Sequence, residues 1–165
     1  RQLFIGSFDV NNAMSNPLKA TKFGLPFRHV PTYLAGYYKY KAGDQFTEGG
    51  KPVNGKRDIC DIYAIMYETS VSVPTLDGTN AFTSPNLVSM ARIKDAKETD
   101  EWTYFKLPFT TLPGKFIDKE KLTMGKYNIS IVFTSSLEGD HFNGAIGSTL
   151  LIDEAELIYR SNLDH

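Results

Sequence analysis

The sequence predicts an all-β domain, a two-sheet antiparallel β-sandwich of jelly-roll type. Aromatic residues make up 13% of the 165 residues and hydrophobic residues 41%, a composition that suits a β-rich core. Segments of alternating apolar and polar side chains are separated by long polar loops, and only residues 118–122 could form a helical turn. Strands without helical crossovers favour antiparallel pairing. The loose turn spacing and the missing Cys–Trp–Cys pattern favour a jelly roll over an immunoglobulin-type sandwich.

The expected strands follow one another along the chain, and the loops between them are rich in turn-forming residues. The strands cover residues 3–10, 32–41, 58–70, 87–96, 101–109, 127–135 and 149–159. Residues 11–26, 42–57 and 73–85 contain the Gly, Asn, Ser, Pro, Lys and Asp that break such alternation. No internal repeat or linker interrupts this order, so residues 1–165 are expected to form a single domain.

Alternation assigns a core side to each long strand, because successive side chains of a strand point to opposite faces. The expected core residues are Leu34, Gly36, Tyr38, Tyr40, Cys60, Ile62, Ala64, Met66, Tyr127, Ile129, Ile131, Phe133, Leu151, Ala155, Leu157 and Tyr159. The same alternation turns Asp153 inward. An unpaired buried carboxylate is costly, so Asp153 requires a cation or several hydrogen-bond donors.

Charge and cysteine content exclude several classes of protein. The formal net charge is −1, which favours neither nucleic acid nor an anionic membrane as a partner. Cys60 is the only cysteine, so an internal disulfide and a zinc finger are excluded, and its apolar neighbours predict a buried thiol. No apolar run is long enough to span a bilayer. The sequence begins with Arg1, so we expect a processed protein or the C-terminal part of a longer chain.

Several segments carry a resemblance to known families. The opening from Gly6 to Asp9, the closing strand from Ile152 to Leu157 and the strand from Trp102 to Phe109 resemble jelly-roll carbohydrate-binding modules of the galactose-binding-domain-like type. More closely, the chain resembles the putative carbohydrate metabolism domain family. The segments that carry this resemblance are residues 33–41, 61–68, 102–109, 133–136, 144–148 and 153–154.

The family resemblance implies a biological setting. Members lie at the C-terminus of exported or surface lipoproteins of gut Bacteroidetes, usually after another β domain. It therefore implies an upstream β domain as a partner, a periplasmic or cell-surface location, and membrane contact only through a lipid anchor outside this sequence.

A structural Ca²⁺ is a further implication, because related modules often hold one between the opening and closing strands. By position, Asp9 and Asp153 would supply carboxylate ligands, with main-chain oxygens completing the shell. The alternative is that Asp153 accepts hydrogen bonds from backbone N–H groups and that Asp9 caps a turn.

A sugar-binding face is predicted from the non-core sides of two long strands. The residues assigned to it are Tyr37, Lys39, Asp61, Tyr63 and Tyr67. If the two strands are neighbours in one sheet, these residues form an open patch in which aromatic rings stack on sugar C–H faces and charged groups bind hydroxyls. Alternatively, the tyrosines pack under loops or against a neighbouring domain.

The loop at residues 138–143 and Trp102 are also candidates for glycan contact. Asp140, His141 and Asn143 could reach over the rim of the face, or the loop glycines could simply turn the chain. Trp102 could stack on a sugar, but its place at the start of a strand leads us to expect a structural, core position.

No catalytic pair of carboxylates is evident, although a glycosidase needs two acids that face each other. The candidates are Asp61, Glu68, Asp140, Glu154 and Glu156. Asp61 and Glu68 have opposite parity on one strand, and adjacent outward acids such as Glu154 and Glu156 are usually solvated. His29 and His165 complete no Ser–His–Asp set.

The sequence therefore predicts a non-catalytic glycan-binding domain of an exported or surface protein. The main alternative is an interaction domain whose aromatic face docks an upstream domain or another protein. A glycoside hydrolase or lyase ranks last.

Overall fold

The computed structural model of the chain describes residues 29–70, 82–137 and 143–160 in full, and the backbone of short strands at residues 2–4, 6–8, 21–23, 25–27 and 76–77.

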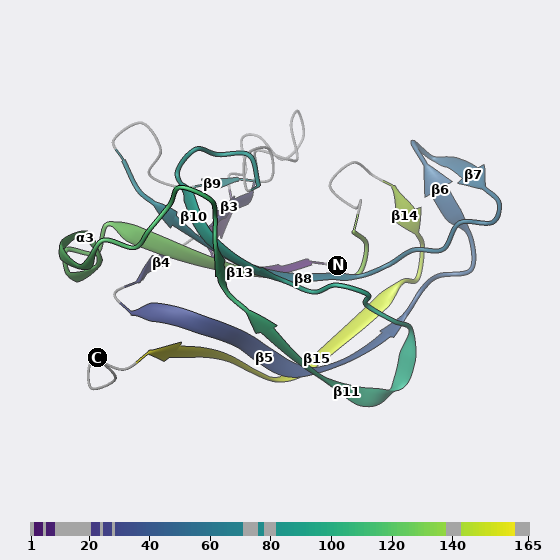
Figure 1. The fold of residues 1–165 in the computed structure, drawn as a ribbon. Helices are drawn as coiled ribbons and strands as arrows, with labels where there is room; N and C mark the ends of the chain where they lie inside the picture. The colour runs from purple at the N-terminus through teal and green to yellow at the C-terminus, as the bar shows by residue number, and fades with distance from the viewer. Residues whose placement is uncertain are drawn as a thin grey trace.

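The described chain is almost entirely β and is dominated by two antiparallel sheets, one layered on the other (Figure 1). The larger, here the β8 sheet, has the order β1(Gln2–Phe4)-β13(Tyr127–Thr134)-β8(Asp61–Glu68)-β10(Leu87–Arg92)-β12(Thr110–Thr111), and β4(Leu25–Phe27) also pairs with β13. The other, here the β5 sheet, has the order β11(Thr99–Pro108)-β5(Val30–Lys41)-β15(Thr149–Arg160). The predicted all-β, antiparallel architecture is confirmed.

Smaller elements complete the described structure. Two three-stranded sheets have the orders β14(Gly144–Ala145)-β6(Phe46–Glu48)-β7(Lys51–Val53) and β2(Gly6–Phe8)-β3(Thr21–Phe23)-β9(Leu76–Asp77). The helix α3(Lys119–Thr123) begins after Asp118, whose carboxylate accepts hydrogen bonds from the N–H groups of Glu120 and Lys121, so the expected helical turn is confirmed. None of the helices in the described residues is long and apolar enough to cross a membrane.

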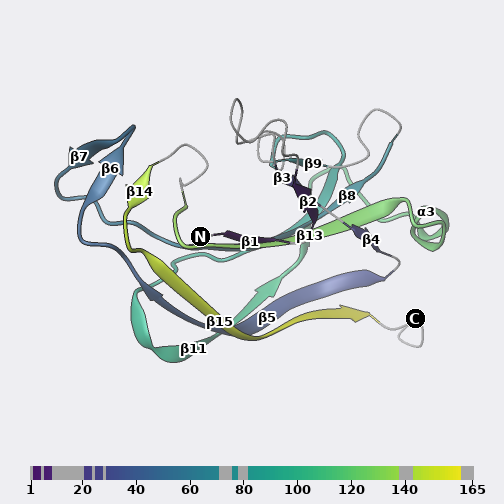
Figure 2. The same cartoon turned by 180° about the vertical axis from the view of Figure 1, so that it is seen from behind.

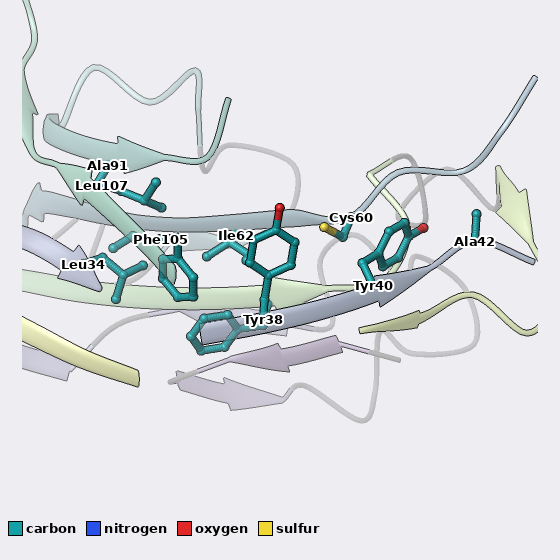
Figure 3. Packing of buried hydrophobic residues seen from close by; sticks show 11 residues of the cluster. Leu34, Tyr38, Tyr40, Ala42, Cys60, Ile62, Ala91, Phe105 and Leu107 are labelled. Carbon is teal, nitrogen blue, oxygen red and sulfur yellow. The ribbon is translucent and has the colours of Figure 1, made fainter. Parts of the chain in front are cut away.

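The main core lies between the two large sheets, as Figure 3 shows. Leu34, Tyr38 and Tyr40 of β5 pack there against Ile62 and Ala64 of β8, with Cys60, Phe105 and Phe133 in the same cluster. The predicted core sides of these two strands are thus confirmed. Gly36 is part of the packing, because a Cβ at this position would lie 2.8 Å from Cζ of Phe105.

The β8 sheet is buried on both faces. Tyr63, Ile65 and Tyr67 point away from the main core, yet each is at most 5% exposed and packs in a second cluster with Leu87 and Val132. The prediction that the non-core side of β8 is open to solvent is therefore wrong. A central strand that is covered on both faces has apolar residues in nearly every position. Tyr63 and Tyr67 carry a polar hydroxyl on an apolar ring, so alternation alone does not distinguish a buried from an exposed side for them.

The last strand, β15, has the opposite parity to the one expected. Leu150 and Ile152 pack against the main core, whereas Leu151 is 48% exposed and Asp153 is also exposed. The pairing register with β5 then shifts between Asp153 and Glu156, and Glu154 has φ +50°. Ala155 and Tyr159 are exposed as well, so their predicted burial is also wrong. Three consecutive apolar residues left the phase of the strand ambiguous, and a bulge changes that phase midway.

Candidate functional site

The most distinctive exposed surface is the outward side of the β5 sheet, here called the outer face. The cross-strand register places Tyr104, Tyr37 and Asp153 side by side on its three strands. By the same register its members are Tyr33, Tyr37, Lys39, Tyr104, Lys106, Leu151, Asp153 and Glu156. Trp102 joins them through the contact of its ring with Lys39. Figures 1 and 2 show this sheet as the outermost layer, and no described segment covers its outward side.

Aromatic side chains give the outer face its character. Trp102 is 45% exposed and Tyr104 is 54% exposed, which is unusual for such large side chains in a sheet. The rings of Tyr37 and Tyr104 lie with centroids 5.3 Å apart at an interplanar angle of 52°. Lys39 Nζ lies 4.7 Å from the centroid of the Trp102 ring. The face thus presents ordered aromatic rings to solvent rather than isolated exposed side chains.

The expected core position of Trp102 is wrong, and the sequence contains the reason. Phe105 and Leu107 fill the core at 5% and 8% exposure, so alternation counted backwards from them sends Tyr104 and Trp102 outward. This signal could have identified Trp102 as a surface residue.

Charged groups flank the aromatic rings. Lys106 Nζ lies 4.3 Å from the centroid of the Tyr33 ring, and neither Lys39 nor Lys106 has an ion-pair partner in the described part of the chain. Asp153 and Glu156 stand exposed on β15, with Asp153 beside Tyr37 of β5 and both acids across β5 from Tyr104 and Lys106 of β11. A ligand on this face would therefore meet rings, ammonium donors and carboxylate acceptors within three adjacent strands.

The predicted five-residue sugar face does not exist as one surface. Tyr37 and Lys39 lie on the outer face, but Asp61, Tyr63 and Tyr67 lie on the β8 sheet, which is not a neighbour of β5 in hydrogen bonding. Asp61 is 5% exposed, and its two carboxylate oxygens accept hydrogen bonds from Arg92 Nε and Nη2 at 3.1 and 2.7 Å. The two strands face each other across the core instead of lying side by side.

The aromatic residues of β8 have other neighbours. The Tyr63 ring lies 4.7 Å from the Phe82 ring, and the Tyr67 hydroxyl accepts a hydrogen bond from Asn128 Nδ2 at 3.3 Å. Both tyrosines are therefore packing residues of the β8 sheet, and neither can stack on a sugar at the outer face.

The predicted rim loop is only partly described. Asp140 and His141 lie outside the described residues. Asn143 precedes β14, and its Oδ1 accepts a hydrogen bond from the N–H of Gly49 at 3.0 Å, which ties it to the turn between β6 and β7.

The calcium prediction assumed that the Asp153 carboxylate is buried, and the structure contradicts this assumption. This carboxylate is exposed and accepts a hydrogen bond from the N–H of its own neighbour, Glu154, at 2.9 Å. Asp9 lies outside the described residues. Within the described ranges no three His, Cys, Asp or Glu side chains are grouped so as to hold a metal ion. A calcium site remains a prediction, which thermal melts with and without chelator would test.

The sequence predicts a buried carboxylate at Asp153, but Asp153 is exposed and Asp58 is buried. Asp58 is 5% exposed, and its Oδ2 accepts hydrogen bonds from Ser136 Oγ at 2.5 Å, Ser148 Oγ at 2.6 Å and Ala145 N at 3.0 Å. Its Oδ1 accepts one more from Ile59 N at 3.0 Å. Four donors satisfy the charge without a cation, so the Asp58 site is structural.

Residues 144–148, here called the glycine-rich motif, supply two of the four donors to Asp58, from Ala145 N and Ser148 Oγ. A Cβ at Gly144 would lie 2.8 Å from Ser136 Oγ and 3.2 Å from Asp58 Oδ2, so only glycine lets the chain approach so closely. The hydroxyl of Ser148 also accepts a hydrogen bond from Gly43 N at 3.0 Å.

Several acids of the described residues are held by basic partners. Asp61 is paired with Arg92, and Glu68 Oε1 lies 2.8 Å from Lys121 Nζ. Arg57 binds Glu98 through two hydrogen bonds of 2.8 and 2.7 Å, and this contact, with a further hydrogen bond from Ala42 N, lowers the pKa of Glu98 to about 2. Burial raises the pKa of the Cys60 thiol to about 12, so this cysteine is not a nucleophile.

Comparison with known proteins gives a family and two solved relatives. The family model for the putative carbohydrate metabolism domain matches residues 1–158. A crystal structure of a putative glycoside hydrolase from Bacteroides thetaiotaomicron is 90% identical, with a TM-score of 0.97, and the match covers 98% of this chain and 47% of that one. A crystal structure of a putative glycoside hydrolase from Bacteroides vulgatus is 50% identical, with a TM-score of 0.91, and the match covers 96% of this chain and 64% of that one. The chain thus spans less than two thirds of either relative, and no curated protein matches it.

Proposed function

Since the chain belongs to the putative carbohydrate metabolism domain family, we propose that it binds glycans without catalysis and does so through the outer face. One observation carries this proposal: Trp102 and Tyr104 of β11 stand exposed, with Tyr104 beside Tyr37 and Trp102 beside Lys39 of the adjacent strand β5. Pyranose rings have apolar C–H faces that pack on aromatic rings, and a sheet holds those rings in place before binding.

The charged residues of the outer face give the glycan its orientation. Lys39 and Lys106 donate hydrogen bonds to sugar hydroxyls, while Asp153 and Glu156 accept them. Because the face is exposed, these hydrogen bonds replace bonds to water at a small net gain, so the affinity for one short glycan is weak. An open sheet surface suits an extended polysaccharide better than an enclosed single sugar.

Aromatic substitutions test the proposal most directly. A pyranose that covers about 60 Å² of the indole, roughly a third of a buried aromatic side chain, contributes about 1.5 kcal/mol, which is about tenfold in affinity. We therefore expect Trp102→Ala to weaken glycan retention in affinity electrophoresis about tenfold, and the double variant Trp102→Ala/Tyr104→Ala to abolish it.

Phe116→Ala is the matched control, because Phe116 is 73% exposed and lies outside the outer face. Equal retention of the double variant and the Phe116 variant across a panel of polysaccharides would refute the proposed site.

A second candidate function is docking of the outer face onto another domain. It is favoured by one observation, that the chain matches only 47% and 64% of its two solved relatives, which therefore contain further structure. In that case the changes corresponding to Trp102→Ala/Tyr104→Ala would lower the unfolding temperature of the longer Bacteroides thetaiotaomicron relative. Glycan retention would stay unchanged.

Hydrolysis ranks last, although the solved relatives are named putative glycoside hydrolases. The reaction needs two carboxylates on either side of a glycosidic bond, and two of the candidate acids, Asp61 and Glu68, are engaged in ion pairs with Arg92 and Lys121. Release of reducing sugar from labelled polysaccharides, abolished by changing one acid, would establish an enzyme.

The proposal extends to the type of fold and to location. A jelly-roll, galactose-binding-domain-like topology is supported by the pairing of the first long strand, β5, with the last, β15. An exported protein, periplasmic or held at the cell surface by a lipid anchor, fits the capture of extracellular glycans. Fractionation of the producing cells would test this location.

A further inference from the structure

A groove of about 510 Å³ lies where the chain passes from β11 to β12 beside β10. Its apolar lining includes Met90, Leu107 and Leu112. Met90 pairs with Thr110 across β10 and β12, so the hydroxyl-bearing edge strand stands next to this apolar surface. The volume lies in the range of small-ligand sites and is far larger than a simple inorganic anion requires.

Two cations lie along the groove, and one of them is rigidly held. Arg92 binds buried Asp61 through Nε and Nη2, and its guanidinium lies 4.3 Å from the Phe82 ring centroid. A guanidinium has five N–H donors, so the contact with Asp61 leaves others free to bind a ligand. The arginine is therefore oriented before any ligand arrives.

Lys94 makes the groove positively charged. Its side chain is exposed and has no ion-pair partner within the described ranges. Asp61 neutralises Arg92, whereas none of the described residues that line the groove is acidic. The remaining charge of Lys94 attracts an anion, and Thr110, which pairs with Met90 and lies on the same side of the sheet, adds a hydroxyl group to the lining.

We propose that this groove binds a saccharide unit that carries an anionic substituent, such as a uronic acid. The sugar ring packs on the apolar surface, one of its hydroxyls bonds to the hydroxyl of Thr110, and its carboxylate binds Lys94 and Arg92. A ligand with apolar faces, hydroxyls and an acid on one ring matches all three kinds of lining group. The groove residues are not members of the outer face, so the inference does not depend on the function proposed for that face.

An uncharged version of the same ligand separates this site from general sugar binding. Isothermal titration with an oligogalacturonate is expected to show binding that is at least about tenfold weaker for its methyl ester, because a charge-assisted hydrogen bond is lost while the ring is kept. Lys94→Ala should cause a similar loss, and Lys94→Arg should restore most of the affinity. Lys119→Ala removes one exposed charge elsewhere and is the control.

Backbone amide chemical shifts locate the ligand without any variant. Oligogalacturonate should perturb the amides of Thr110, Thr111 and Leu112. Equal affinity for acid and methyl ester, no effect of Lys94→Ala, or shifts confined to other strands would each overturn the proposal. Equally tight binding of poly-glutamate would reduce the groove to a charge-selective surface and overturn the assignment to saccharide. Neutral polysaccharide retention by the outer face is measured separately, so failure of one site leaves the other testable.

Discussion

Replacing Asp58 by alanine is expected to lower the free energy of unfolding by about 3–5 kcal/mol. The carboxylate is 5% exposed and accepts four hydrogen bonds, two from the hydroxyls of Ser136 and Ser148 and two from backbone N–H groups. Alanine leaves the N–H of Ala145 buried without an acceptor and removes two short charge-assisted bonds. Net contributions of about 1.5 kcal/mol for each bond to the charged group, reduced by rotation of the serine hydroxyls toward other partners, give this magnitude.

Graded variants follow from the same geometry. In Asp58→Asn the amide NH₂ must face either Ala145 N or Ile59 N, both of which are donors, so a loss of about 1–3 kcal/mol is expected. Ser136→Ala removes a single donor and should cost about 1–2 kcal/mol. Asp153→Ala is the matched control, because that carboxylate is exposed and bonds only to the N–H of its neighbour, so its cost should stay below about 0.5 kcal/mol.

Urea denaturation followed by tryptophan fluorescence measures these differences as shifts of the transition midpoint at constant slope. Trp102 is the only tryptophan and lies in the β5 sheet, so one probe reports on the sandwich. If Asp58→Ala were as stable as Asp153→Ala, the assignment of the buried carboxylate to Asp58 would be wrong.

Two further predictions concern ionisable groups of the fold. The contacts of Glu98 with Arg57 and Ala42 lower its pKa from 4.5 to about 2, so their contribution to stability is complete above about pH 4.5 and is lost as the pH falls toward 2. Glu98→Gln should therefore flatten the loss of stability in this range. Burial, together with the nearby Asp61 charge, raises the pKa of the Cys60 thiol to about 12, so a thiol reagent at pH 8 should modify Cys60 only when urea unfolds the protein. Rapid modification of the native chain would contradict the core position of this side chain.

The parts of the fold that could be predicted are those specified by local pattern. The strand around Tyr38 and the start of β8 alternate clearly, and their core sides are confirmed. The helical turn after Asp118 follows from a capping residue and its next three neighbours. In these segments the information lies within a few residues, so neither sheet order nor pairing is needed.

The errors in the site arise where pairing decides the outcome. Whether β5 and β8 are neighbours or face each other depends on contacts between distant segments, which alternation within one strand does not encode. Asp58 shows the same limit, because its partners Ser136 and Ser148 are 78 and 90 residues away. The argument that a buried carboxylate needs several hydrogen-bond donors holds for Asp58. The sequence alone does not show which aspartate the glycine-rich motif encloses.

The glycine-rich motif also helps to position the outer face, because it fixes the pairing register of β15 with β5. Ser148 binds Asp58 and Gly43 N immediately before β15 begins, and Thr149 then pairs with Lys41. A slip of one residue in this pairing would exchange the two sides of the strand up to the bulge, burying Leu151 and Asp153 and exposing Leu150 and Ile152. The buried carboxylate at Asp58 therefore positions the outer face without touching it. Substitutions at Ser148 or Gly144 that leave the chain folded should weaken glycan retention through the register, whereas a catalytic role of the motif would predict lost turnover with retention intact.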